Sequence, residues 1–183
     1  MNNFKITLLI FLLFFMGLKP VDAQDIQWNR FNFIIGYWNG SGTGFGNSKS
    51  EIVASYNFVL DGKYIEVNHH SEFTPTPKKP EGEIHDDWGI ISFDKHNGKY
   101  IYRQFNNEGY YNQYVLNDSL SNDNLLIFET ELMENFVIGS KAKFTIKRIN
   151  EMEMETIFEL YFPGKEYATY GKNKLIRQVD TEE

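Results

Sequence analysis

Glycine occupies every second position along one stretch near the start of the chain. After Trp38 the sequence reads NGSGTGFG, which places glycines at positions 40, 42, 44 and 46. Residues two apart share one face of a β-strand, so one face here carries no side chains. A strand gains from such glycines only where another backbone comes close or where the sheet bends sharply, as at a barrel corner. The stretch 31–46 therefore predicts a strongly bent first strand in a closed β-structure.

The rest of the chain consists of short alternating segments separated by residues typical of turns. Asp61-Gly62 is the strongest signal for a two-residue hairpin. Further strands are predicted over 51–60, 63–73, 84–93, 99–105, 110–117, 125–133, 140–149, 152–162 and 167–178. No separator has room for a crossover helix, so neighbouring strands must be antiparallel. We predict an all-β fold, a single antiparallel up-and-down β-barrel of about ten strands, with a short N-terminal helical turn in 24–32 as a plug.

Alternation with a period of two predicts which side chains face the barrel interior. In 151–160, glutamates alternate with Met152, Met154, Phe158 and Leu160. In 140–149, lysines alternate with apolar residues, so the acidic and basic outer faces of these two strands are expected to pair. The residues expected to be largely buried are Trp38, Phe58, Ile65, Ile90, Phe128, Phe144, Phe158 and Leu160.

Residues 1–23 have the pattern of a secretory signal peptide. Lys5 precedes the apolar run 6–18, and Val21-Asp22-Ala23 forms a small-residue cleavage pattern. The alternative is an uncleaved membrane anchor, but Gly17 and Pro20 make the apolar run short for a bilayer span. We expect an exported protein, periplasmic or extracellular, whose domain spans 24–183 and has no stable membrane insertion after cleavage.

The charge and the cysteine content exclude several classes of partner and site. Removal of 1–23 leaves 16 basic and 24 acidic residues, a net charge of −8. This balance argues against nucleic acid and anionic membranes, which need concentrated Lys and Arg. The absence of cysteine excludes disulfides and thiolate metal sites. Aromatic residues form 16% of the chain, which favours strands, where rings pack on a pleated surface.

Polar residues on two consecutive predicted strands are candidates for ligand contacts. The segment YRQFNNEGYYNQY places Arg103 and Gln104 opposite the region of Asn112, Gln113 and Tyr114. Polar side chains inside a barrel are costly without partners, so one face of this hairpin is a candidate for orienting a ligand among apolar walls. The alternative is an ordinary outward polar face. Flexible side chains expected at the interior wall are Met152 and Met154.

The histidines give a second candidate site at one rim of the barrel. His69 and His70 are adjacent on a strand, so only one points inward, and His69 shares its face with Ile65 and Val67. The proline-rich loop 74–83 returns the chain so that His85 and Asp86 lie near this pair. Such a cluster is able to hold a divalent metal or to act as an acid/base pair. The alternative is a set of polar rim residues hydrogen-bonded to the loop.

Three short motifs resemble the calycin superfamily. They are Gly36-Tyr37-Trp38, Leu60-Asp61-Gly62 and Leu175-Ile176-Arg177. The most similar groups within it are the nitrobindin-like β-barrels and the lipocalin-like secreted bacterial proteins of unknown function. This resemblance implies that Trp38 lies at the closed end of the barrel and that Arg177 lies over its ring. It gives Gly36, Trp38 and Arg177 structural rather than catalytic roles.

The nitrobindin resemblance also implies a b-type haem held by a histidine near the last strand. This chain has no histidine after His96, and the last strand offers only Tyr167 and Tyr170 as oxygen donors. Tyrosine is a known haem ligand. The missing imidazole nevertheless weighs against haem.

The leading functional hypothesis is non-catalytic binding of a small, mainly apolar molecule inside an exported barrel. The chain lacks G-x-S-x-G, a P-loop and H-E-x-x-H, so no standard catalytic motif supports an enzyme. The alternatives are a haem-binding barrel, and an enzyme or metal site built on His69, His70 and His85. An adhesion module is a further class, but it requires an exposed apolar patch on the outer wall. The charged outer faces of the last strands argue against such a patch.

Overall fold

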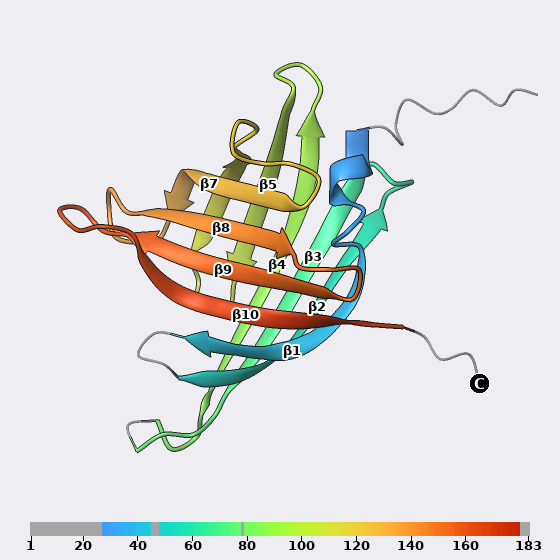
Figure 1. The fold of residues 1–183 in the computed structure, drawn as a ribbon. Coiled ribbons are helices and arrows are strands. Elements are labelled where there is room, and N and C mark those ends of the chain that lie inside the picture. The colour runs from blue at the N-terminus through green and yellow to red at the C-terminus, as the bar shows by residue number, and fades with distance from the viewer. Residues whose placement is uncertain (1–26, 45–47, 78, 180–183) are drawn as a thin grey trace, which may run out of the picture.

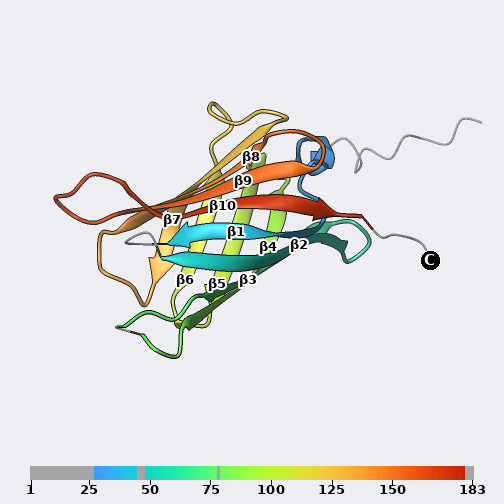
Figure 2. The same ribbon diagram turned by 60° about the horizontal axis from the view of Figure 1, so that its bottom comes forward.

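Ten antiparallel strands close into a barrel because the first strand pairs with the last. The computed structural model describes residues 27–44, 48–77 and 79–179, so the predicted signal peptide and Gly46 lie outside the described residues. Figure 1 shows β1 in blue beside β10 in red, and Figure 2 shows the same seam from a second side. The strands are β1 (Gly36–Gly44), β2 (Lys49–Val59), β3 (Tyr64–Phe73), β4 (Glu83–Asp94), β5 (Lys99–Asn106), β6 (Tyr111–Leu116), β7 (Leu125–Glu134), β8 (Lys141–Arg148), β9 (Glu153–Tyr161) and β10 (Ala168–Gln178).

The predicted fold is confirmed, with one local difference at the first hairpin. The register pairs Val59 with Tyr64, so the β2–β3 loop has four residues rather than two. Leu60, Asp61 and Gly62 all have positive φ, at 51°, 57° and 72°. Because three consecutive residues have positive φ, the turn is longer than the predicted Asp-Gly pair, although Asp61-Gly62 still lies at its tip.

The alternating glycines lie where β1 crosses close to β10. Gly40 is opposite Leu175 in the ladder. A Cβ atom added at Gly40 would lie 2.0 Å from the carbonyl oxygen of Lys174, a distance that no side chain tolerates. The close backbone approach expected from the glycine pattern is therefore confirmed.

One end of the barrel is closed by Trp38 and Arg177. The guanidinium of Arg177 lies 4.3 Å from the centre of the Trp38 ring. It also donates hydrogen bonds to the carbonyl oxygens of Ile35 and, at 2.7 Å, Phe33. Gly36 makes room for this contact, because it has φ +122° and a Cβ there would lie 3.0 Å from Arg177 Nη1. The geometry expected for these three residues is confirmed.

A short helical segment covers the same end. The 3₁₀ turn η1 (Asn29–Phe31) follows Trp28, and Trp28 and Phe31 are buried. Their rings contact Tyr100 at the start of β5, with centroids 5.7 and 4.8 Å apart. This apolar segment is the predicted plug (Figure 1). Within the described ranges, no helix is long and apolar enough to cross a bilayer.

The inward faces of the strands form one core, largely as the alternation predicts. Trp38, Ile65, Phe128, Phe144 and Leu160 are buried, and Phe158 is partly buried. Two expectations are wrong. Phe58 is 40% exposed because it lies near the end of β2, and the buried isoleucine of β4 is Ile91 rather than Ile90.

The charged outer faces of the last strands pair, but not as predicted. The register places lysines of β8 opposite glutamates of β9. The ion pairs instead join β9 to β10, with Glu155 2.9 Å from Lys172 and Glu153 2.9 Å from Lys174. Both partners in each pair are partly or largely in solvent, so these pairs stabilise the fold little.

Trp38 anchors the closed end, so its removal should be costly. We predict that Trp38→Ala lowers the free energy of unfolding by about 3 to 5 kcal/mol, because it removes a buried ring and leaves a cavity. The matched control is Tyr37→Ala at the adjacent, outward position, where 58% of the residue is exposed. This change should cost less than about 1 kcal/mol. Equal losses in denaturant unfolding would contradict the assigned role of Trp38.

Candidate functional site

Polar side chains occupy the barrel interior on five neighbouring strands. Each lies on the inward face of its strand, and most have little or no contact with solvent. Polar groups in a protein interior cost free energy unless they are paired, so this set is the strongest candidate for a functional site. Its members are Tyr56 on β2, His69 on β3, Asp87 on β4, Gln104 on β5, and Asn112 and Tyr114 on β6.

His69 and Tyr56 form a buried pair. The Tyr56 hydroxyl lies 2.6 Å from His69 Nε2, and the two rings meet edge to face. Burial lowers the pKa of His69 to about 4 and raises the pKa of Tyr56. Both groups are therefore neutral near pH 7, and the tautomer of the His69 imidazole sets which of them donates the hydrogen of this bond. This confirms that His69 faces inward.

Gln104, Asn112 and Tyr114 come together as the sequence predicts. Gln104 is opposite Asn112 in the ladder, and the Tyr114 hydroxyl donates to Gln104 Oε1 at 3.0 Å. Asn112 Oδ1 accepts a hydrogen bond from Thr130 at 3.1 Å. The Asn112 side chain also interacts with the Tyr114 hydroxyl, but Asn112 Nδ2 has no partner at hydrogen-bond distance within the described residues. The donor of this fully buried amide is therefore incompletely satisfied, because its contact with the Tyr114 hydroxyl does not reach hydrogen-bond geometry.

Asp87 adds a carboxyl group to the interior. It lies opposite His69 and Asn106 in the ladder. Burial, together with the nearby charges of Glu108 and Asp86, raises the pKa of Asp87 to about 7. Its charge in turn raises the pKa values of Tyr56 and Tyr110. The interior thus holds a carboxyl group that is neutral or charged depending on small changes around it.

Three other predicted ligand contacts lie elsewhere. Arg103 points away from the interior and donates to Ser92 Oγ at 3.0 Å. Met152 precedes β9 and is 42% exposed, so its expected inward orientation is wrong. Met154 faces inward as predicted, but it is packed in the core opposite Leu175 rather than beside the polar set. The outward side of β5 and the start of β9 therefore do not contribute to this site.

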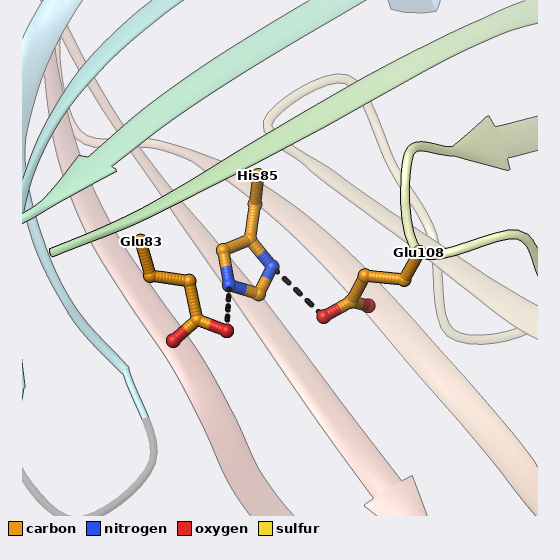
Figure 3. A group of neighbouring side chains, drawn as sticks. All are labelled: Glu83, His85 and Glu108. Carbon is orange, nitrogen blue, oxygen red and sulfur yellow. Dashed lines mark ion pairs between the residues drawn. The ribbon is translucent and has the colours of Figure 1, made fainter. Parts of the chain in front are cut away.

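The histidines do not form the single rim cluster that the sequence suggested. His70 is exposed and lies 2.6 Å from Asp86 and 3.0 Å from Glu72, and these two carboxylates raise the pKa of His70. His85 has a different pair of neighbours (Figure 3). Its Nε2 lies 3.1 Å from Glu83 and its Nδ1 lies 3.2 Å from Glu108. The expected proximity of Asp86 to the histidine pair is confirmed by its contact with His70, whereas His85 has other partners and does not join them.

Aromatic rings cover part of the open end, opposite the Trp38 end. Tyr110, Phe136, Phe162 and Tyr170 form a chain of ring contacts with centroids 5.2 to 6.1 Å apart. Each belongs to or flanks a loop at this end of the barrel, and each is only partly buried. They form an apolar group at the end of the barrel opposite Trp38.

The outer wall also carries an apolar feature. A groove of about 490 Å³ runs across β1 to β5, and its exposed side chains include Tyr37, Val53, Trp88 and Phe105, which are 46 to 58% exposed. The rings of Trp88 and Phe105 are 5.9 Å apart. The expectation of an outer wall without an apolar patch therefore holds for the charged strands β8 to β10 but is wrong for β1 to β5.

The residues present do not fit a haem. Tyr167 is 38% exposed, and its ring lies against Tyr161 and under the ammonium group of Lys143. Tyr170 packs against Phe162. The buried histidine, His69, already uses Nε2 in its hydrogen bond with Tyr56. Since neither the tyrosines of β10 nor His69 offer a suitable donor, we assign no role to haem.

Several residues of the interior and the rim were missed from the sequence. Tyr56 shares a face with Ile52 and Ala54, so the alternation of β2 could have found it. Asp87 is two residues from His85 and lies on the same, inward face of β4, so the alternation of that strand could have found it too. Glu108 lies in a turn, and no periodicity indicates where a turn residue points.

Comparisons with known proteins give the fold but no family. Neither the protein-family models nor the curated proteins gave a match. Among solved structures, Rv2717c from M. tuberculosis has 12% identity and a TM-score of 0.59 over 89% of this chain and 100% of that chain. EF1p2_mFAP2b bound to DFHBI has 10% identity and a TM-score of 0.45, and the match covers 83% of this chain and 99% of that chain. A de novo designed fluorescence-activating β-barrel has 9% identity and a TM-score of 0.44, and the match covers 82% of this chain and 98% of that chain. The first likeness shows a shared barrel fold.

The neutral, buried state of His69 predicts how stability depends on pH. The pKa of His69 is about 4 in the folded chain and 6.5 when the ring is exposed, so the unfolded chain binds the additional proton between these values. Relative to His69→Gln, the natural protein should therefore lose about 3 kcal/mol of unfolding free energy as the pH falls from 7 to 4. His96→Gln, in an exposed turn, is the control for the substitution itself. A constant difference for His69→Gln would show that His69 is not buried neutral.

Proposed function

We propose that this chain is an exported, lipocalin-like or nitrobindin-like barrel of the calycin superfamily that binds a small, mainly apolar molecule without chemical conversion. The ligand enters at the open end, where the aromatic group around Phe136 lies. Its apolar part packs against rings, and one polar atom is held by the interior polar set. Export follows from the predicted signal peptide over 1–23.

The observation that carries this proposal is the unused donor of Asn112. The residue has 0% exposure, and its Nδ2 group lacks a partner among the described residues. A buried donor without an acceptor costs about 1 to 3 kcal/mol, so a packed core would favour an apolar residue there. A ligand oxygen placed at Nδ2 would remove this cost.

Neighbouring groups suit the same role. Gln104 and Tyr114 are joined by a hydrogen bond and are held between strands, so they are fixed in position. Tyr102 stacks on Tyr114 with an interplanar angle of 16°, which provides a flat apolar surface beside the polar atoms. A few fixed polar groups among aromatic walls are the usual composition of a small-molecule site.

The proposal predicts opposite effects of one substitution on binding and on stability. Asn112→Leu keeps the shape of the side chain and removes the unused donor, so the variant should unfold at an equal or higher temperature. In native mass spectrometry of protein purified from its natural host compartment, the natural chain should carry a small adduct that organic solvent releases. The affinity of Asn112→Leu for this molecule should fall by about tenfold, as expected for the loss of about 1.4 kcal/mol, and the occupancy of the adduct should fall with it.

The matched control is the adjacent residue. Gln113 points outward and donates to Glu131, so Gln113→Ala should retain the adduct. Absence of any adduct on the natural protein would contradict the proposed function. Equal occupancy in Asn112→Leu would place any bound molecule outside this interior site.

A further inference from the structure

A second group of side chains, at the open end, has donor atoms that converge. One donor atom from each of Glu83, His85 and Glu108 lies within 4.8 Å of the other two. Figure 3 shows both carboxylates turned toward the edge of the His85 ring. We propose that these three residues bind a divalent transition-metal cation. This site is separate from the interior donor of Asn112, so either can be present without the other.

The three ligands come from two elements that are tied together. Glu83 and His85 are two residues apart on β4 and share its inward face. Glu108 lies in the turn between β5 and β6. In that turn Asn107 donates to the carbonyl oxygens of Ile84 and Asp86, both at 3.0 Å. These bonds hold Glu108 beside β4 without any metal, as a preorganised site requires.

The orientation of each ligand is also fixed by its neighbours. The Phe73 ring packs edge to face against His85, with centroids 5.1 Å apart. Lys79 pairs with Glu83 Oε2, which leaves Oε1 facing His85. The ligands are one-third to one-half exposed, with relative side-chain areas of 35%, 31% and 44%, so a cation from solution reaches them.

The local charge favours a cation. Asp87 lies on the same face of β4, two residues beyond His85, and has neither an ion pair nor a hydrogen bond in the described ranges. Two carboxylates thus contact His85, and Lys79 is the only lysine or arginine that forms an ion pair with either of them within the described residues. A bound dication would balance this excess.

The donor types indicate which metal is preferred. Imidazole favours Zn²⁺ and other transition metals, whereas Ca²⁺ and Mg²⁺ prefer oxygen ligands alone. Adjacent donors in a tetrahedral Zn²⁺ site lie about 3.4 Å apart, so small rotations of Glu83 and Glu108 bring the present donors into range. Only one ring nitrogen coordinates the metal. Three protein ligands leave a position open for water or for a ligand oxygen.

Zinc titration of the purified protein, produced without a polyhistidine tag, tests this site. Isothermal titration calorimetry with ZnCl₂ at pH 7.5 should show one equivalent bound. His85→Gln and Glu108→Gln should each weaken binding at least about tenfold, and CaCl₂ should bind more weakly than ZnCl₂. Glu108 is in an exposed turn, so its variant should fold normally, and thermal unfolding checks this.

His70 provides a matched control. It also lies between two carboxylates, Glu72 and Asp86, but in the described part of the chain these donors do not converge as a group of three. His70→Gln should therefore bind Zn²⁺ within about twofold of the natural protein. The proposal would be overturned if 0.1 mM Zn²⁺ gave no heat of binding or if Ca²⁺ bound more tightly than Zn²⁺. It would also be overturned if His85→Gln bound Zn²⁺ as tightly as the natural protein, or if His70→Gln lost as much Zn²⁺ affinity as His85→Gln.

Discussion

The contact between Arg177 and Trp38 determines how the two ends of the barrel differ. Arg177 belongs to the last strand and Trp38 to the first, so their contact holds the seam at which the barrel closes. A cation over an indole contributes about 0.5 to 2 kcal/mol, and the hydrogen bonds to the carbonyls of Phe33 and Ile35 add to it. The apolar plug formed by Trp28 and Phe31 covers this end.

The polar interior comes at a cost to the fold. Each neutral polar side chain in the barrel loses its water and regains only the bonds that its neighbours offer. Tyr56 with His69, and Tyr114 with Gln104, are satisfied in this way. Asn112 is not, and the buried carboxyl group of Asp87 is held close to neutrality. A barrel selected only for stability would fill these positions with apolar residues, so their presence supports the proposed ligand site.

The fold could be predicted because its signals are local, whereas much of the candidate site depends on contacts between distant residues. Alternation along β3 correctly placed His69 inside, whereas for β5 and β6 it left open which face of the hairpin carries the inward polar residues. It failed for Phe58, because a strand end is open to solvent whatever its parity, and for Ile90, because the inward face of β4 falls on the odd residues.

Partners across the barrel were less accessible to sequence reasoning. The side chains of Asp86 and Asp87 face opposite ways. The sequence reasoning did not distinguish the carboxyl group that pairs with His70 from the one that faces inward. Glu108 joins His85 only through the position of a turn, which two hydrogen bonds from Asn107 fix. Alternation with a period of two along a strand gives no information about such a contact.

A crystal structure of the protein purified from its natural host tests the central claim most directly. If the interior is a ligand site, electron density for a small molecule should place an acceptor atom about 3 Å from Asn112 Nδ2, with its apolar part toward the rings at the open end. An interior in which only protein side chains or a single water meet that donor would contradict the account, and the barrel would then be a packed core.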